Sequence, residues 1–473
     1  MSISFKDLNI SPNILESLEK KGYESPTEIQ VKLIEKFSEC KNDLIAQAQT
    51  GTGKTAAYGI PILDSLSDDS KDVQALILTP TRELTLQVCK ELKEFNYHQS
   101  VRVCAILGGE SIERQRSELK RNPAVVVGSP GRIIDHIKRK NLNISKLSYL
   151  VLDEADEMLN NGFIEDVEYI IGKTPSSKRT LFVSATINAT LRSLANNYLN
   201  DYISINTKTK NSVTSLTEQI YYEVKDSDKT NAICRIFDTV DDLYGIVFCQ
   251  TKRDVDAIAQ ELMKRGYPAE GLHGDLSQHQ RNRILGLFRQ KKYSILVATD
   301  VAARGIDIMN LSHVFNLSLP QDNESYVHRI GRTGRAGKKG TAITIISPRE
   351  FYRLNRLQKM LKITIKKERI PSTAQIKDKK AQLLTNKIAD QNIDGETQLI
   401  DKLYSSLSEN LNDKELIKKC LQTIIRSDIT MQSHYDVEDL FDKSSHRAPR
   451  RDSSRKESSR KPFRKKRFYS NRS

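Results

Sequence analysis

The sequence predicts an α/β protein with two tandem domains, each a parallel sheet flanked by helices. Two long stretches, residues 41–205 and 219–371, alternate short apolar runs with segments of helical spacing. This alternation is typical of repeated β-α-β units, which form parallel sheets. Between them, residues 206–218 are polar and show neither helical nor strand periodicity. We therefore expect a first domain over 1–205, a linker over 206–218 and a second domain over 219–371.

The expected strands are runs of apolar residues bounded by polar or turn-forming ones. In the first domain these runs are 44–46, 75–78, 101–107, 124–127, 149–152, 180–183 and 203–205. In the second domain they are 220–224, 245–249, 269–272, 294–298, 313–317 and 341–346. Residues 1–40 have apolar positions at helical spacing, so they predict a short helical preface to the first sheet.

The C-terminal part differs in texture from the two domains. Within residues 372–444, apolar positions from Leu399 to Ile425 recur at helical spacing, which predicts two amphipathic helices. Such a short pair needs a partner for its apolar stripe, either the preceding domain or a second copy, and we favour a homodimer. Residues 445–473 are rich in Ser, Arg and Lys, so we expect a disordered tail that binds RNA; the alternative is a tail that only improves solubility.

Charge and cysteine usage limit the functional classes. The net charge is +15, and 446–473 contribute twelve Lys and Arg against two acidic residues, or +10. This concentration is typical of an arm that binds a polyanion. The six cysteines are scattered without a C-x-x-C pair, which favours reduced thiols over disulfides or a zinc site. No signal-peptide pattern or long apolar run is present, so we expect a cytoplasmic protein.

A phosphate-binding loop is predicted where the first apolar run ends. The loop residues are Gln49, Thr50, Gly51, Thr52, Gly53, Lys54 and Thr55. A strand, a glycine-containing loop and a helix N-terminus together direct backbone N–H groups at an anion. Lys54 can reach the β- and γ-phosphates, and the Thr55 hydroxyl can bind Mg²⁺. The first glycine of the usual pattern is replaced by Ala48.

A second cluster supplies the carboxylates. The apolar run 147–152 ends directly in Asp153, Glu154, Ala155 and Asp156. A carboxylate at the tip of a strand beside a phosphate loop is suited to hold Mg²⁺, partly through water, and we assign this to Asp153. Glu154 is placed to orient and deprotonate an attacking water. Standing alone, such a cluster would suggest only a solvated turn.

At these motifs the chain resembles the DEAD-box RNA helicases, and the resemblance extends over most of residues 1–370. The motifs that carry the resemblance are, in chain order, Pro26–Gln30 with Gly22, Tyr23 and the upstream Phe5, then 80–84, 108–109, 129–132, 184–186, 273–275 with Gln278 and Arg281, 298–307 and 328–335. The departures are Ser129 in place of Thr and the variable segment 249–251. The resemblance implies two RecA-like domains and, in bacterial members, cold-shock or ribosome-assembly roles.

The resemblance also assigns roles to individual residues. Adenine contacts would come from Tyr23, Thr27 and Gln30, with core packing as the alternative for Tyr23, and Asp307 would lie near the ribose. Arg332 and Arg335 would reach across a cleft to the γ-phosphate. RNA would be bound by Thr81, Arg82, Gly109, Ser129, Arg132, Gln278, Arg281 and Thr299. Coupling between nucleotide and RNA would involve Asp156, Ser184, Thr186 and His328.

We therefore expect an ATP-dependent, Mg²⁺-dependent RNA helicase that unwinds short duplexes when its two domains close on single-stranded RNA. Two alternatives stay open: an ATP-gated RNA clamp that unwinds little, and a DNA translocase. The sequence does not identify the biological RNA; ribosome assembly, messenger decay and cold adaptation all suit it, with ribosomal precursors or the decay machinery as partners.

Overall fold

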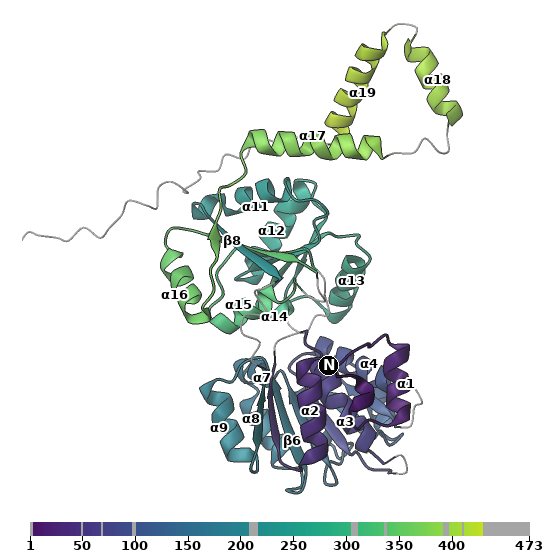
Figure 1. Cartoon of the computed structure of the whole chain (residues 1–473), viewed down its shortest axis with the longest axis vertical. Helices are drawn as coiled ribbons and strands as arrows, with labels where there is room; N and C mark the ends of the chain where they lie inside the picture. The colour runs from purple at the N-terminus through teal and green to yellow at the C-terminus, as the bar shows by residue number, and fades with distance from the viewer. Residues whose placement is uncertain are drawn as a thin grey trace, which may run out of the picture.

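The computed structural model describes residues 3–48, 51–67, 70–96, 101–207, 216–303, 311–334, 338–390, 397–408 and 411–428. Two parallel seven-stranded sheets, each flanked by helices, lie one above the other (Figure 1). This arrangement confirms the predicted fold class. Among the described residues, no helix is both long and apolar enough to cross a membrane.

The first sheet has the strand order β3-β4-β2-β5-β6-β1-β7. Its strands are β1 Leu44–Gln47, β2 Ala75–Leu78, β3 Val103–Ile106, β4 Val125–Gly128, β5 Tyr149–Asp153, β6 Arg179–Ser184 and β7 Ile203–Asn206. The inner strands are apolar runs because helices cover both faces of the sheet. β5, β6 and β1 are neighbours, so the segments that follow them meet at one edge of the sheet.

The helices of the first domain lie before the first predicted strand or in the intervals between the predicted strands. They are η1 Phe5–Asp7, α1 Pro12–Lys20, α2 Glu28–Glu39, α3 Lys54–Ser65, α4 Arg82–Phe95, α5 Ile112–Leu119, α6 Pro130–Lys138, α7 Ala155–Asn160, α8 Ile164–Ile171 and α9 Ala189–Tyr198. Side-chain N-caps fix several starts; the Thr81 hydroxyl, for example, accepts a hydrogen bond from the Leu84 amide at the start of α4.

The second sheet has the order β10-β11-β9-β12-β13-β8-β14. Its strands are β8 Thr217–Glu223, β9 Gly245–Cys249, β10 Ala269–Leu272, β11 Ile295–Thr299, β12 His313–Asn316, β13 Gly340–Ile346 and β14 Lys366–Lys367. Its helices are η2 Asp226–Asp228, α11 Lys229–Phe237, α12 Lys252–Lys264, α13 Gln278–Arg289, α14 Asp300–Ala303, α15 Asn323–Ile330 and α16 Phe351–Leu361. The strand β14 was not predicted.

Three helices follow the second sheet: α17 Thr373–Ala389, α18 Thr397–Ser408 and α19 Asp413–Asp428. The two predicted amphipathic helices correspond to α18 and α19, whereas α17 was not predicted. Ion pairs tie α17 to the second domain, Lys379 to Asp241 at 2.7 Å and Lys380 to Asp238 at 3.0 Å. The tail 445–473 lies outside the described residues.

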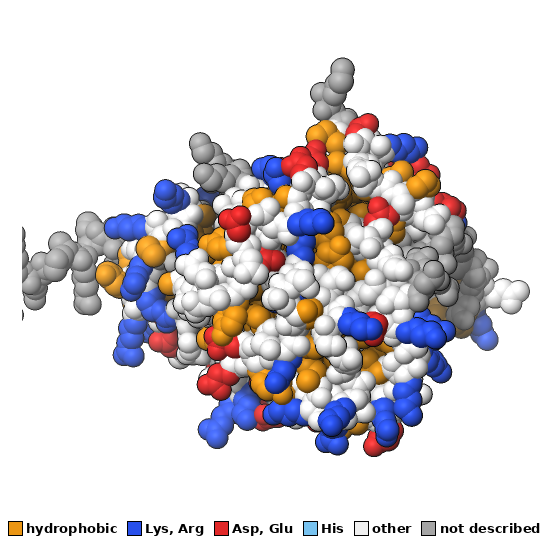
Figure 2. Space-filling view, turned by 90° about the horizontal axis from the view of Figure 1, so that it is seen from below, with side chains coloured by type: hydrophobic (Ala, Val, Ile, Leu, Met, Phe, Trp, Pro, Cys, Tyr) orange, Lys and Arg blue, Asp and Glu red, His pale blue; other side chains and the backbone are white. Residues whose placement is uncertain are grey.

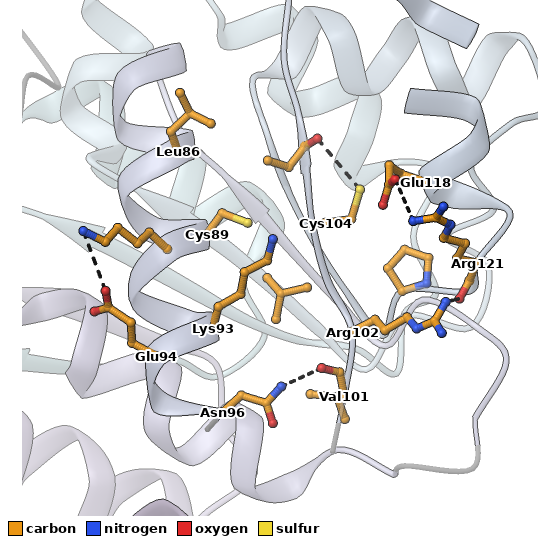
Figure 3. A pocket seen from close by; sticks show the side chains of 14 residues that line it. Leu86, Cys89, Lys93, Glu94, Asn96, Val101, Arg102, Cys104, Glu118 and Arg121 are labelled. Atoms are coloured by element: carbon orange, nitrogen blue, oxygen red, sulfur yellow. Dashed lines mark hydrogen bonds and ion pairs between the residues drawn. The ribbon is translucent and has the colours of Figure 1, made fainter. Parts of the chain in front are cut away.

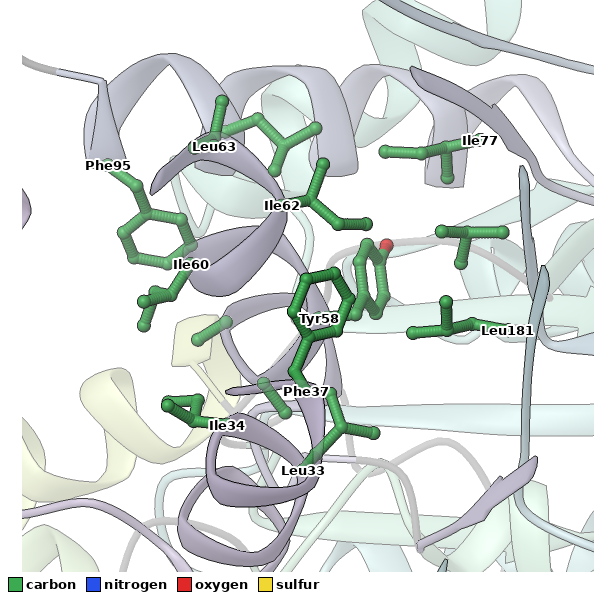
Figure 4. Packing of buried hydrophobic residues seen from close by; sticks show 14 of the residues in the cluster. Leu33, Ile34, Phe37, Tyr58, Ile60, Ile62, Leu63, Ile77, Phe95 and Leu181 are labelled. Carbon is green, nitrogen blue, oxygen red and sulfur yellow. The ribbon is translucent and has the colours of Figure 1, made fainter. Parts of the chain in front are cut away.

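The core of the first domain fixes the helices that carry the site. Leu33 and Ile34 of α2 and Tyr58 and Ile60 of α3 pack over the sheet against residues such as Leu181 (Figure 4). All five are fully buried. Figure 2 shows the end of this domain that faces away from the second domain. There, charged side chains of both signs are interspersed with apolar ones.

Arg179, the first residue of β6, holds the C-terminal end of α2. Its buried guanidinium donates to the backbone oxygens of Lys36, Phe37 and Asn42, at 3.3, 2.9 and 2.8 Å. It also lies 4.3 Å from the centre of the Phe37 ring. The bond to Phe37 satisfies a carbonyl that the last turn of α2 leaves without a helical partner, and a cation there complements the helix dipole.

We predict that Arg179→Met lowers the free energy of unfolding by about 2 kcal/mol, because one buried and two partly buried carbonyls lose a charged donor while the apolar stem is kept. Urea unfolding measures the change. Lys173→Met, at an exposed position in the same domain, is the matched control. Equal stability of the two variants would refute the role given to Arg179.

Candidate functional site

The loop between β1 and α3 is shaped to receive an anion. Gly51 and Gly53 have φ values of +79° and +78°, a left-handed conformation that favours glycine. Lys54 begins α3 and is buried, and its Nζ has no hydrogen-bond partner in the described structure. A buried ammonium without an acceptor is costly unless an anion joins it, so this geometry fits a phosphate. Gln49 and Thr50 lie outside the described residues.

The N-terminal end of α2 is bonded to this loop. The Thr27 hydroxyl donates to the Thr52 carbonyl at 2.8 Å, and Gln30 Nε2 donates to the Gly53 carbonyl at 3.2 Å. Gln30 Oε1 accepts from the Thr27 amide at 2.8 Å. A Cβ on Gly53 would lie 2.3 Å from Gln30 Nε2, which explains the glycine. The Gln30 amide can still make one further bond at each end, as adenine recognition requires.

Tyr23 packs within the protein. Its ring makes edge contacts with Phe5 and Phe95, at centroid distances of 6.1 and 5.9 Å. The structure thus gives Tyr23 the packing role that was the alternative to base stacking. A contact with adenine stays a prediction.

The end of β5 carries the two carboxylates. Asp153 is buried; its Oδ2 accepts from the Tyr58 hydroxyl at 2.8 Å and its Oδ1 from the Glu154 amide at 2.9 Å. Burial raises the pKa of both Asp153 and Glu154, and the charge of Lys54 partly offsets each rise. Glu154 has a φ of +49°, a conformation unusual outside glycine, which commonly marks functional sites. A carboxylate with a raised pKa is a better proton acceptor.

Asp156 connects the turn after β5 to the turn after β6. Its Oδ2 accepts from the Thr186 amide at 2.9 Å and from the Thr186 hydroxyl at 2.8 Å. The Ser184 hydroxyl donates to the Thr186 carbonyl at 2.6 Å. This network lies within the first domain, and the contact with the second domain comes from the next residue along α7.

That contact joins Glu157 to His328 of α15, with 2.7 Å between Oε1 and Nδ1. Both side chains are buried. Burial alone would lower the pKa of His328, but the hydrogen bond to Glu157 and its charge raise it overall. Arg332 follows α15, and its charge opposes the rise in the pKa of Glu154. Arg335 and Asp307 lie outside the described residues.

Two arginines of the first domain present unused donors. The Nε and Nη1 atoms of Arg82 and the Nη1 of Arg132 are buried without a hydrogen-bond partner. Within the described part of the chain, Arg82 has a loose ion pair with Glu110, at 3.6 Å, and Arg132 one with Asp135, at 3.9 Å. Gly109 has a φ of +75°, and a Cβ there would lie 2.9 Å from Arg82 Nη1. Ser129 caps α6 without a side-chain bond, so its hydroxyl is not used by the helix. These groups suit a phosphodiester backbone.

Gln278 and Arg281 contact the first domain. Arg281 Nη2 and Nε lie 3.0 and 3.2 Å from Glu83 Oε1, and Gln278 Nε2 lies 3.5 Å from the same oxygen. Arg281 also donates to the Ala302 carbonyl at 3.2 Å, and the Thr299 hydroxyl accepts from the Ala302 amide at 3.4 Å. The predicted RNA-binding residues of the second domain are thus joined to the helix that begins with Arg82.

Comparison with known proteins identifies the family. A DEAD/DEAH box helicase model matches residues 27–194, and a helicase conserved C-terminal domain model matches residues 228–337. The DEAD-box ATP-dependent RNA helicase CshA of Geobacillus kaustophilus is 41% identical over 423 residues, which cover 89% of this chain and 90% of the relative. The chain belongs to the DEAD-box family of ATP-dependent RNA helicases.

Other members support this assignment. A probable ATP-dependent RNA helicase of Methanocaldococcus jannaschii is 46% identical over 365 residues, which cover 77% of this chain and 98% of that one. The structure of Saccharomyces cerevisiae Dbp5 bound to RNA and ADP BeF3 superimposes with a TM-score of 0.72 at 29% identity, covering 80% of this chain and 98% of that chain.

The residues of this site fit Mg²⁺ bound together with a nucleoside triphosphate. Thr55, which follows Lys54 in α3, and Asp153, at the end of β5, supply oxygen ligands, and they would hold the ion. Bound there, Mg²⁺ would neutralise phosphate charge. No group of three or more His, Cys, Asp or Glu side chains among the described residues is arranged to hold a metal without other ligands.

Two residues that join the DEAD-box domains were missed in the sequence. Glu83 and Glu157 lie directly beside predicted residues, Arg82 and Asp156, yet neither was assigned a role. Their proximity to the motifs was the available signal. Their partners lie in the other domain, so no pattern along the sequence predicts these contacts.

We predict that Glu157→Gln removes a pH dependence of domain closure. The pKa of His328 is raised where Glu157 contacts it, so forming this domain contact takes up a proton. The stabilisation is complete at pH values below the ordinary pKa of a histidine, about 6.5, and is lost as pH rises through the raised value. Energy transfer between fluorophores on the two domains, with RNA and an ATP analogue, measures closure. Glu165→Gln, on an exposed carboxylate, should keep the wild-type profile. An unchanged profile in Glu157→Gln would contradict the assignment.

Proposed function

We propose that this protein locally unwinds short RNA duplexes and remodels RNA or ribonucleoprotein by ATP-driven closure of its two domains. The observation that carries the proposal is the contact between Glu157 and His328. It joins the helix that follows the catalytic carboxylates to the helix that leads to Arg332. A change at the nucleotide can thereby alter how the domains fit together.

Within this proposal, ATP binds between the domains. Lys54 receives the phosphates, Gln30 and Thr27 recognise adenine, and Arg332 and Arg335 complete the site at the γ-phosphate. Glu154 accepts a proton from the attacking water. An arginine supplied in this way accelerates other nucleotide hydrolases by about 10³- to 10⁵-fold.

RNA is held along the loops that follow the strands. Arg82, Arg132 and Gly109 bind the backbone from the first domain, and Thr299, with Gln278 and Arg281, contributes from the second. The unused guanidinium donors of the first domain support this assignment. ATP and RNA must favour the closed form reciprocally, since each changes the affinity for the other. A bent strand in the closed site excludes its complement, so a short duplex opens.

The proposal also covers the binding partners of the protein and its location in the cell. The basic tail adds RNA affinity, and ribosomal precursors or the RNA-decay machinery are the proposed context, in the cytoplasm. The described cysteines are all unpaired, which suits a reducing compartment. A second copy of the chain is the proposed partner of α18, whose exposed apolar stripe consists of Leu399, Ile400, Leu403, Tyr404 and Leu407, each 42–54% exposed.

We predict that Glu154→Gln binds ATP and RNA normally but hydrolyses ATP about 100-fold more slowly or worse, because the proton acceptor is lost. RNA-stimulated phosphate release and displacement of one strand from a short RNA duplex are measured together. Glu165→Gln again serves as the control. A wild-type rate would remove Glu154 as the base, and rapid hydrolysis by the wild type without strand displacement would favour an RNA clamp.

We predict that Leu403→Glu with Leu407→Glu weakens self-association about tenfold or more, because two carboxylates would be buried in the interface. Sedimentation equilibrium measures the change. Ser405→Glu, on the opposite face of α18, should leave association intact. A wild-type chain that is monomeric at all tested concentrations would contradict the proposed dimer.

A further inference from the structure

The outer face of α16 carries a row of cations. Five exposed basic side chains lie on this helix or within two residues of it: Arg349, Arg353, Arg356, Lys359 and Lys362. None has an acidic partner among the described residues, and Arg353 donates only to the Pro320 carbonyl, at 3.0 Å. The neighbouring acid, Glu350, points inward, where it pairs with Lys229 at 2.5 Å.

The spacing places these charges where they repel one another. Arg353, Arg356 and Lys359 are three residues apart within α16, so they lie on one side of the helix, where like charges are unfavourable; Arg349 precedes the helix and Lys362 is its C-cap. The carboxylate at the N-terminal end of α16, on its N-cap residue Glu350, is already engaged by Lys229 and by the Ser347 amide, and the first turn adds no further acidic residue. This arrangement does not stabilise the free helix, but an anionic ligand would relieve the repulsion.

An aromatic side chain stands among the cations. Tyr352 is 77% exposed, whereas the inner residues Leu354 and Leu357 pack with Tyr326 and Ile330 of α15. The core therefore holds the helix without using Tyr352. Exposed aromatic rings among arginines are typical of surfaces that bind unpaired nucleotides, because bases stack on them.

The charges at a large groove of the first domain are arranged differently. A groove of about 1090 Å³ opens between α4 and the edge strand β3 (Figure 3). There Arg121 pairs with Glu118 at 3.0 Å and Lys90 with Glu94 at 3.7 Å. These two pairs neutralise part of the charge of the groove, where Lys93 and Arg102 have no ion pair among the described residues, whereas none of the five cations at α16 has one.

The α16 face is also separate from the cleft. Figure 1 shows α16 and α13 on opposite sides of the second domain. The strand order agrees, because α13 follows the edge strand β10 and α16 precedes the other edge strand, β14. A strand of RNA held by Gln278 and Arg281 would not lie along α16, so this face would take a different part of the same RNA.

We infer that the outer face of α16 is a second RNA-binding surface, which holds the phosphates of an unpaired segment with Arg349, Arg356 and Lys359 and stacks a base on Tyr352. This inference rests on the proposed function, since it extends the RNA already held in the cleft. The surface would retain a flanking single strand while the cleft opens and closes.

The test compares two triple variants of the full chain. The first replaces Arg349, Arg356 and Lys359 by Gln. The control replaces Lys41, Lys71 and Lys120, exposed cations that precede β1, β2 and β4 at the end of the sheet away from the site. Binding is measured against salt for an RNA just long enough for the cleft and for the same RNA with a single-stranded extension.

For the extended RNA, the first variant should lower the salt slope by about 2, from three cations at about 0.7 each. Binding of the short RNA and the maximal RNA-stimulated ATPase rate should stay unchanged. A slope equal to that of the control variant overturns the inference. Wild-type protein that binds neither RNA would instead refute the proposed function. Loss of polyglutamate binding with unchanged RNA binding would assign the face to an acidic protein and also overturn it.

A single substitution tests the stacking contact. Tyr352→Ala should weaken binding of the extended RNA about fivefold or more. It should also abolish photocrosslinking of α16 to thiouridine placed in the extension. A crosslink of unchanged yield, or one confined to the cleft in the wild type, overturns the role of Tyr352.

Discussion

The buried ammonium of Lys54 is the constraint on which the site depends. No described group accepts a hydrogen bond from it, so the folded protein keeps a cation where an anion is needed. The surrounding structure keeps it there. α2 holds the loop through Thr27 and Gln30, and the Tyr58 hydroxyl holds Asp153. Nucleotide binding therefore completes an electrostatic arrangement that folding has already prepared.

The two domains contact each other beside the proposed nucleotide site and beside the proposed RNA site. Glu157 lies on the helix after the carboxylates and contacts the second domain through His328. Glu83 follows Arg82 and contacts Arg281. Because Arg82 and Glu83 share the first turn of α4, the position of that turn would set both the proposed RNA contact of Arg82 and the domain contact of Glu83. The first turn of α4 would thus couple RNA binding to the contact between the two domains.

The sheets could be predicted from the sequence because parallel strands covered on both faces are continuous apolar runs, as Ala75–Leu78 is. β14 escaped detection because two lysines form the whole strand. α17 escaped because ion pairs from Lys379 and Lys380, rather than an apolar stripe, hold it.

The residues of the site also fall into two groups, those that a local motif predicts and those that only the fold brings together. The phosphate loop is a local motif, so Lys54 and Thr55 could be assigned to it from the sequence alone. The partners of Glu83 and Glu157 lie in the other domain, and only the fold brings them together. Tyr23 illustrates a different difficulty, since an aromatic residue near a motif suits packing as well as recognition, and its edge contacts with Phe5 and Phe95 are visible only in three dimensions.

The bond from Gln30 to the Gly53 carbonyl has a consequence for selectivity among nucleotides. The residue proposed to read the base also braces the backbone that encloses the phosphates. A ligand whose base cannot satisfy Gln30 would draw this amide toward a poorer partner and loosen the brace. Discrimination between bases would then appear as a slower catalytic step as well as a weaker complex.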